Sequence, residues 1–216
     1  MRILPVAALV VAAPLAAWLV ERVGTKLVVV AGLLVVASAL WLLSTVQVGD
    51  GYGQVAGALA LLGCGMGFVM APATESIMGS VPLAKAGVGS AMNDTTRQVG
   101  GALGVAVLGS ILAAGYGTAI APALRDAPPP IAQTAGDSIG AAATIAAQLG
   151  PRGQGLLEAA RLAFIQGMGD ALQVGAGVAA LAALLVLLFL PARATGTMNE
   201  TRRGRRRDPA IEGDET

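Results

Sequence analysis

The sequence predicts an all-α integral membrane protein built on a bundle of five transmembrane helices. The first observation is a set of five mostly apolar runs of about 18 to 24 residues, at positions 3–20, 27–46, 55–78, 98–120 and 171–190. A helix rises about 1.5 Å per residue, so about 20 residues cross a hydrocarbon core about 30 Å thick. The second observation is the composition, with 55% hydrophobic and 12% charged residues. A soluble domain would instead alternate apolar and polar residues at helix or strand period.

The composition argues against several kinds of site. The chain has no His and one Cys, Cys64, which lies in the third run. A single thiol can form neither an internal disulfide nor a Cys-based metal site. The sequence also lacks the GxxxxGK[ST] phosphate loop, the dinucleotide fingerprint after a strand and the HExxH zinc motif. We therefore predict no cofactor, no metal ion, no nucleic-acid partner, no catalytic residues and no enzymatic activity.

The placement of basic residues predicts the orientation. Ten of the 14 Lys and Arg residues follow the first run, follow the third run or lie beyond the fifth. Cytoplasmic loops carry the excess of Lys and Arg, so these segments are expected in the cytoplasm. The N-terminus is then outside, the connection 121–170 is extracytoplasmic, and the charged segment 192–216 is a disordered cytoplasmic tail. Residues 1–191 form the predicted membrane domain, in the plasma membrane.

Arg2 complicates the N-terminal end, because a basic residue before the first run favours an N-terminus inside the cell. One alternative is a secretory signal, with residues 3–11 as its apolar region and Ala-Pro-Leu-Ala-Ala near a cleavage site. Against cleavage, the apolar run continues through Trp18 to Val20. Another alternative is that Met1 is not the natural start and further helices precede it.

The first two runs have simple features. Pro5 and Pro14 in the first run are tolerated in membrane helices, which they often kink. Residues 23–25, Val-Gly-Thr, are predicted to form a tight cytoplasmic turn. The second run is uniformly aliphatic, and Trp41 lies near its outer end, where an indole suits the membrane interface. Residues 49–53, Gly-Asp-Gly-Tyr-Gly, are predicted to form an outside turn.

The third and fourth runs are richer in glycine. Gly63 and Gly67 in the third run, and Gly100 and Gly104 in the fourth, form small-xxx-small faces that allow another helix to approach closely. Pro72 is expected to bend or break the third helix. A short cytoplasmic connection is predicted at 80–90, and the polar residues 93–98 are predicted to start the fourth helix.

The region between the fourth and fifth runs is predicted in three parts. Residues 121–138, which include Pro128-Pro129-Pro130, are expected to form a loop without regular structure. Residues 138–148 are predicted to form a short interfacial helix. Residues 156–168 carry an apolar stripe at i, i+3, i+4 spacing and are expected to lead almost directly into the fifth run.

One stretch resembles a known family. Residues 71–112 contain in order APATE at 71–75, VP at 81–82, AGVGSA at 86–91 and TRQVGGALGVAVLGSIL at 96–112. This pattern resembles the C-terminal part of the 14-helix drug:proton antiporters of the major facilitator superfamily. The resemblance extends over about residues 3–190 and implies that the five runs are helices 10 to 14. It also implies that the first, third and fourth runs line the central cavity.

The first turn resembles the cytoplasmic loop signature of that superfamily, G-x-L-x-D-R-x-G-[RK]-[RK]. The residues that fit it are Leu19, Glu21, Arg22, Gly24 and Lys26. Three departures are Ala17 in place of the Gly, Glu21 in place of the Asp, and Thr25 at a basic position. The second half of the superfamily usually carries such a degraded copy.

The candidate substrate cavity or gate residues are Pro72, Glu75, Asp94, Arg97 and Gln98. A charge at membrane depth costs at least about 2.5 kcal/mol, so one interpretation is that Glu75 faces a cavity or a partner. The alternative, which its position late in the run favours, is that Glu75 lies at the cytoplasmic interface and pairs with Arg97 or Lys85. Asp94 and Arg97 are either part of a cytoplasmic gate or a helix cap with a topology role. Glu21 and Arg22 are a gating pair by resemblance or else a solvated turn.

The predicted function is part of a secondary active transporter that exports drugs or antibiotics in exchange for protons. The resemblance implies that the proton-coupling carboxylates lie largely in N-terminal helices, so we expect an incomplete fragment that is inactive alone. Its expected partners are the lipid bilayer, a small amphipathic substrate, protons and the missing N-terminal helices. The alternative is a small accessory or split-transporter subunit that works only with a partner chain, through the glycine faces at Gly63/Gly67 and Gly100/Gly104.

Overall fold

The computed structural model describes residues 19, 20, 22–79 and 81–189. Its four long helices are α2 (Thr25–Ser44), α3 (Tyr52–Gly79), α4 (Ala86–Ile120) and α7 (Gln154–Phe189). Each of the four contains a stretch long and apolar enough to cross a membrane. The described residues contain no strand, which confirms the predicted all-α membrane class. The tail at 192–216 and all but the end of the first apolar run lie outside the described residues.

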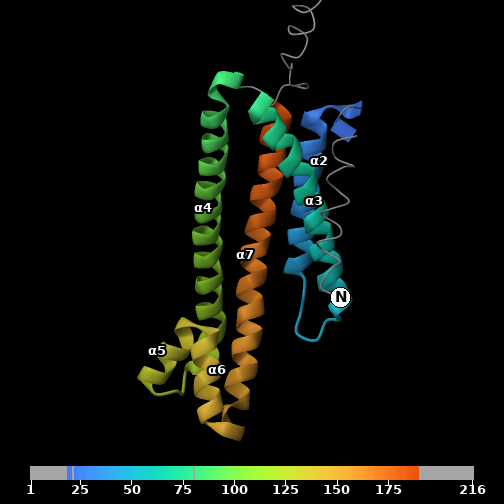
Figure 1. The fold of residues 1–216 in the computed structure, drawn as a ribbon. Coiled ribbons are helices and arrows are strands. Elements are labelled where there is room, and N and C mark those ends of the chain that lie inside the picture. Colours follow the sequence, from blue (N-terminus) through green and yellow to red (C-terminus); the bar gives the residue numbers. More distant parts are fainter. Residues whose placement is uncertain (1–18, 21, 80, 190–216) are drawn as a thin grey trace, which may run out of the picture.

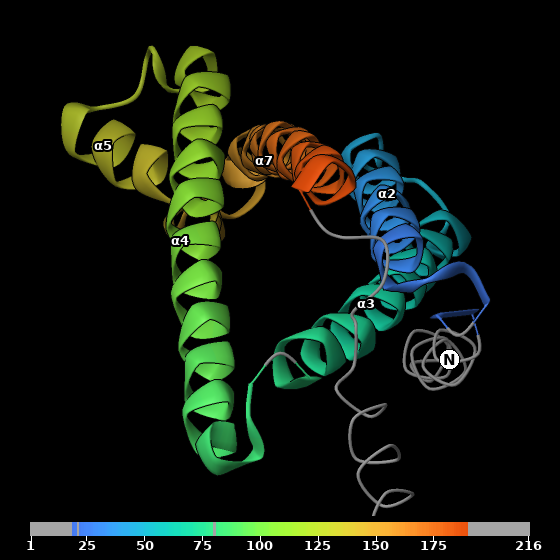
Figure 2. The ribbon, with the colours of Figure 1, turned by 90° about the horizontal axis from the view of Figure 1, so that it is seen from above.

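Seen from above, α7 lies between α4 and α2, and α3 lies beside α2 (Figure 2). Contacts are extensive between α2 and α3, between α2 and α7, and between α4 and α7. Contacts between α3 and α4 are few, so one side of the bundle stays open in the described part of the chain. The helix that connects the two halves of this bundle is therefore α7.

Helix α4 starts 12 residues before the predicted position 98, at Ala86, directly after the 3₁₀ turn η1 (Leu83–Lys85). The short connection predicted at 80–90 is therefore half helical. The polar residues 93–98 do not begin the helix; they lie inside it, and the helix continues through them. Thr96 fits inside the helix because its hydroxyl donates to the Met92 carbonyl at 2.8 Å.

The expectation that 121–138 lacks regular structure is wrong. It contains the 3₁₀ turn η2 (Ala121–Leu124) and the helix α5 (Pro129–Asp137). Prolines suit the first turn of a helix, where their missing N–H groups need no partner. The Pro128 carbonyl accepts from the N–H groups of Ile131 and Ala132, at 2.9 and 3.0 Å. The proline run therefore starts a helix here.

The rest of the 121–170 connection is also helical. Helix α6 (Ile139–Gln148) matches the predicted short helix at 138–148, and Ser138 caps it by accepting the Ala141 N–H at 3.1 Å. A 3₁₀ turn, η3 (Gly150–Gly153), then leads into α7. The predicted amphipathic segment and the predicted fifth span together form α7, a single helix of 36 residues.

The connection packs as a layer where α4 ends and α7 begins, past the end of α2 (Figure 1). Its buried core joins four helices through Tyr116, Ile120, Leu124, Ala135, Ala142, Ala160 and Ala163. The Tyr116 hydroxyl donates to the Ala135 carbonyl at 2.9 Å and so satisfies both buried groups. We call this set of helices, η2, α5 and α6 with the adjoining ends of α4 and α7, the end layer.

Glycines bring the long helices to backbone distance at positions that the small-xxx-small pattern did not select. A Cβ added at Gly65 of α3 would lie 2.8 Å from Cγ2 and 2.9 Å from the backbone nitrogen of Val36 on α2. A Cβ added at Gly167 of α7 would lie 2.7 Å from the Leu112 carbonyl oxygen and 2.8 Å from the Tyr116 nitrogen on α4. Apolar side chains gain little from one another in lipid, so such close contacts are a main source of helix association.

Replacing Gly167 by Ala should lower the thermal stability of the chain, because the new methyl group meets backbone atoms that cannot rotate away. Overpacking of this kind costs about 1–3 kcal/mol. The control is Gly155→Ala in the same helix, where an added Cβ meets nothing within 4 Å. Circular dichroism melting in detergent measures both variants. Equal melting temperatures would contradict the packing of α7 on α4.

Candidate functional site

Glu75 lies on α3, four residues before the helix ends at Gly79, and its side chain is exposed. Pro72 is fully buried one turn earlier, and the helix continues through it to Gly79 without a break. The Thr74 hydroxyl donates to the Met70 carbonyl at 2.9 Å, which provides an extra hydrogen bond in this turn. Within the described residues, Glu75 forms no ion pair with Arg97 or Lys85. The pairing considered as the alternative for Glu75 is therefore not formed in this structure.

Asp94, Arg97 and Gln98 are exposed side chains on α4. Asp94 is the ninth residue of this helix, because α4 begins at Ala86. The field of a helix dipole falls off within the first turn, so the predicted capping role of Asp94 is wrong. Together with the half-buried Asn93, these three residues form a polar segment within the helix. We call these four residues the α4 polar band.

The glycine face next to this band has no neighbour in the described part of the chain. A Cβ added at Gly100, Gly101 or Gly104 would meet nothing within 4 Å. Between positions 90 and 107 only Asn93 and Gly104 are even half-buried. The predicted close approach at Gly100 and Gly104 is therefore not made by the helices described, and it stays a prediction for a contact with another element.

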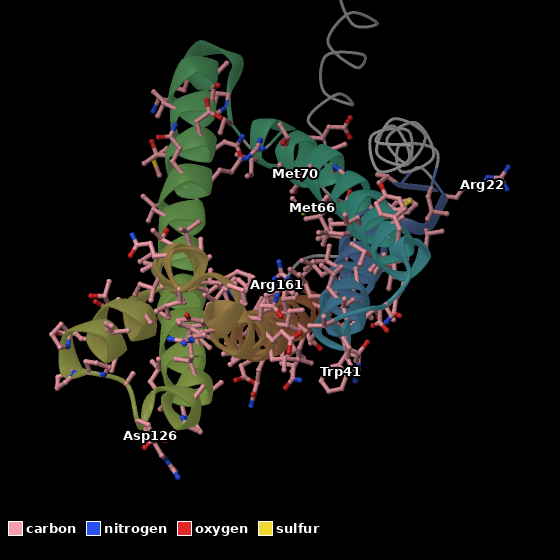
Figure 3. All side chains as sticks on the ribbon, turned by 90° about the horizontal axis from the view of Figure 1, so that it is seen from below. Arg22, Trp41, Met66, Met70, Asp126 and Arg161 are labelled. Atoms are coloured by element: carbon pink, nitrogen blue, oxygen red, sulfur yellow. The ribbon has the colours of Figure 1, made fainter. Side chains whose placement is uncertain are left out.

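On α3 the predicted face contains a half-buried Gly63 and a buried Gly67. Gly65, which lies between them in the sequence and on a different side of the helix, contacts Val36 of α2. Side chains that the sequence reasoning missed are Met66 and Met70, on the side of α3 that faces α4 and α7 (Figure 3). Their spacing of four residues, which places both on one side of a helix, could have identified them from the sequence. Methionine is flexible and polarizable, as suits a surface that adapts to varied ligands.

The cytoplasmic loop signature is only partly described. Glu21 lies outside the described residues, Leu19 and Lys26 are half-buried, and Arg22 is exposed. Gly24 is buried, stands at the N-cap of α2 with φ of 93°, and donates to the Val20 carbonyl at 2.9 Å. A side chain would strain the backbone at this φ, so a physical reason exists for glycine at the position.

A further carboxylate lies in α7. The sequence placed Asp170 just before the fifth run, but the structure places it 16 residues into α7, beside Gly115 of α4. Its side chain is exposed. The described residues contain no group of three or more His, Cys, Asp or Glu side chains that could hold a metal ion.

Several curated proteins are similar to this chain. A tetracenomycin C resistance and export protein of Streptomyces glaucescens is 35% identical over 191 residues, which cover 84% of this chain and 35% of that protein. The multidrug efflux pump LfrA of Mycolicibacterium smegmatis is 32% identical over 198 residues, 81% of this chain and 37% of the pump. The methyl viologen resistance protein SmvA of Salmonella typhimurium is 34% identical over 154 residues, 70% and 31% of the two proteins. No family model matches the chain.

The chain is similar to about a third of the length of proteins that belong to the drug:proton antiporters of the major facilitator superfamily. The resemblance predicted from residues 71–112 is therefore confirmed. The chain spans about a third of the length of the curated antiporter relatives that it matches. Its membrane-length helices and these relatives make it a multi-pass membrane protein.

Replacing Glu75 or Arg97 by Gln should change the unfolding free energy of this chain by less than about 0.5 kcal/mol, as is usual for exposed sites. The reason is that neither side chain forms an ion pair within the described residues. Melting in detergent micelles measures the effect, with Gly167→Ala as the destabilised reference. A loss above about 1 kcal/mol in either variant would show a structural role that the contacts do not explain.

Proposed function

We propose that this chain forms part of a secondary active transporter that exports drugs or antibiotics in exchange for protons. The observation that carries the proposal is the exposed α4 polar band on a helix long enough to cross a membrane. A charge facing hydrocarbon costs at least about 2.5 kcal/mol, so the band needs a water-filled cavity or further helices beside it. A helix that lines the cavity of a transporter has both a water-filled cavity and further helices beside it.

The surface around the band suits small amphipathic substrates. Glu75 offers a negative charge to a cationic group, and the half-buried Met70 and exposed Met66 offer an adaptable apolar surface. Asp94 and Arg97 carry charges that can form and break ion pairs with another helix during alternating access. The names of the relatives, which include an antibiotic exporter and a multidrug efflux pump, support this substrate class.

We propose further that the chain corresponds to helices 10 to 14 and needs other helices to transport. The open glycine face at Gly100 and Gly104 supports a contact with such helices. These come either from a longer form of the same protein or from a partner chain in a split system. The proposed location is the plasma membrane, with the N-terminus outside, the C-terminus in the cytoplasm and the end layer outside. The proposed role is transport and not catalysis.

Residues 1–216 expressed alone in a host without its main efflux pumps should give no proton-dependent ethidium efflux. Joined behind the first nine helices of the tetracenomycin exporter, the chain should restore efflux, because the coupling carboxylates are then present. In that chimera Glu75→Gln and Arg97→Gln should each lower the efflux rate about tenfold or more, as for loss of about 1.4 kcal/mol or more.

The matched control is Glu158→Gln, which removes an exposed carboxylate from α7. It should leave efflux unchanged. Efflux by residues 1–216 alone would overturn the fragment proposal. A chimera that inserts into the membrane at normal levels but exports nothing would count against the export proposal.

A reporter fused after Thr216 should report the cytoplasm, because the tail carries six of the 14 basic residues. Green fluorescent protein at this position should fluoresce, whereas alkaline phosphatase should be inactive. The same phosphatase inserted between Gly49 and Asp50, in the turn between α2 and α3, should be active. The opposite pattern would reverse the proposed orientation.

A further inference from the structure

Two adjacent pockets follow the junction of α2 and α7. The first, of about 600 Å³, lies at the C-terminal end of α2 and is lined on its polar side by Ser44, Gln47, Gln166, Asp170 and Gln173. The second, of about 570 Å³, lies further along the same junction and is lined by Trp41, Leu61, Ala176, Ala180 and neighbouring residues. Gln173 lines both pockets, so they are neighbours along the junction.

The depth of each pocket follows from the length of α2. This helix has 20 residues and so is about 30 Å long, the thickness of the hydrocarbon core. Ser44 at its end therefore marks the edge of the hydrocarbon. Gly169 of α7 lies at the same level, because a Cβ there would be 3.1 Å from the Ser44 carbonyl oxygen. We therefore infer that the first pocket lies at the interface and the second within the hydrocarbon region.

The first pocket favours a positively charged group. Asp170 gives it a carboxylate, and among the described residues that line it there is no Lys or Arg. The hydroxyls of Ser44 and Thr45 already donate to the Trp41 and Leu42 carbonyls, at 2.7 and 2.8 Å, so their oxygens remain as acceptors. The side-chain amides of the three glutamines add both donors and acceptors. A headgroup with an ammonium and a phosphate matches this set.

The second pocket favours an apolar chain. It is lined by small residues such as Ala176, Gly177 and Ala180, and by Leu42 and Leu61. Trp41, one turn before Ser44, borders the end of this pocket nearest the interface, with 60% of its surface exposed. Exposed leucines continue along α7 beyond it, at Leu181 and Leu184. The groove therefore opens toward the bilayer, and its occupant should come from the bilayer.

We propose that the α2–α7 junction binds a phospholipid with a primary-amine headgroup, phosphatidylethanolamine. The ammonium pairs with the Asp170 carboxylate, and the side-chain amides of Gln47 and Gln166 donate to the phosphate. One acyl chain fills the groove over Ala176 and Ala180. This site lies on a different surface from the α4 polar band and does not depend on the proposed transport function.

The test is native mass spectrometry of residues 1–216 purified in detergent and incubated with equal amounts of three lipids. The lipids are phosphatidylethanolamine, phosphatidylcholine and the anionic phosphatidylglycerol. Phosphatidylethanolamine should be retained about tenfold more than phosphatidylglycerol, as expected for one charge-assisted hydrogen bond. Equal retention of the two lipids by the wild-type chain would overturn the proposal.

Substitutions at Asp170 test whether the preference for phosphatidylethanolamine arises at this site. Asp170→Asn should remove the preference for phosphatidylethanolamine, whereas Asp170→Glu should keep it. Glu158→Gln, an exposed carboxylate of the same helix that lines neither pocket, is the matched control and should bind as the wild type does. An unchanged preference in Asp170→Asn would overturn the role of the carboxylate.

The groove has a separate variant, Ala180→Phe, which fills the space for the acyl chain and should lower retention of all three lipids. This variant and the wild-type lipid comparison still decide the proposal if Asp170→Asn does not fold. Displacement of phosphatidylethanolamine by tetraphenylphosphonium, a drug-like cation without acyl chains, would contradict the lipid assignment and indicate a drug site.

Discussion

Two glycines of α7 hold the neighbouring helices at backbone distance, and the arrangement of the described bundle depends on them. Gly167 meets the backbone of α4 near Gly115, and Gly169 meets the last carbonyl of α2 at Ser44. In a bilayer, lipid tails solvate apolar side chains as well as other apolar side chains do. Close backbone approach, through dispersion and weak polar contacts, therefore decides which helices associate. These two contacts place α7 between α4 and α2, and α3 then packs against the other side of α2.

Hydropathy predicted the long helices well because the physical requirement is simple. In hydrocarbon every backbone N–H and C=O must be bonded internally, so an apolar run of about 20 residues becomes a helix. The helix boundaries were predicted less well, because polarity reports the edge of the membrane and not the end of the hydrogen-bond ladder. Helix α4 begins at Ala86 and not at the predicted position 98, whereas α7 joins two segments that were predicted to follow each other almost directly. The helix at Pro129 depends on a first-turn preference that a count of prolines does not reveal.

The packing glycines show what one sequence cannot supply. Gly100 and Gly104 have the spacing that allows close approach but meet no neighbour in the described chain, whereas Gly32, Gly65, Gly115, Gly167 and Gly169 do make close contacts. Spacing identifies a small face, whereas the partner that meets it depends on the arrangement of all helices. The candidate residues Glu75, Asp94 and Arg97 were found because charge in a membrane segment is costly, yet their mutual distance could not be deduced. The sequence placed Asp170 outside the spans, so it was not considered as a site.

The length of α7 has a practical consequence for imaging. A continuous helix of 36 residues is about 54 Å long, which exceeds the hydrocarbon thickness by roughly 20 Å. Together with the packed end layer, it should project beyond a detergent micelle. Small membrane proteins are difficult to align in cryo-electron microscopy because the micelle hides their features. Here the projection itself can serve as a fiducial mark, without a bound antibody fragment.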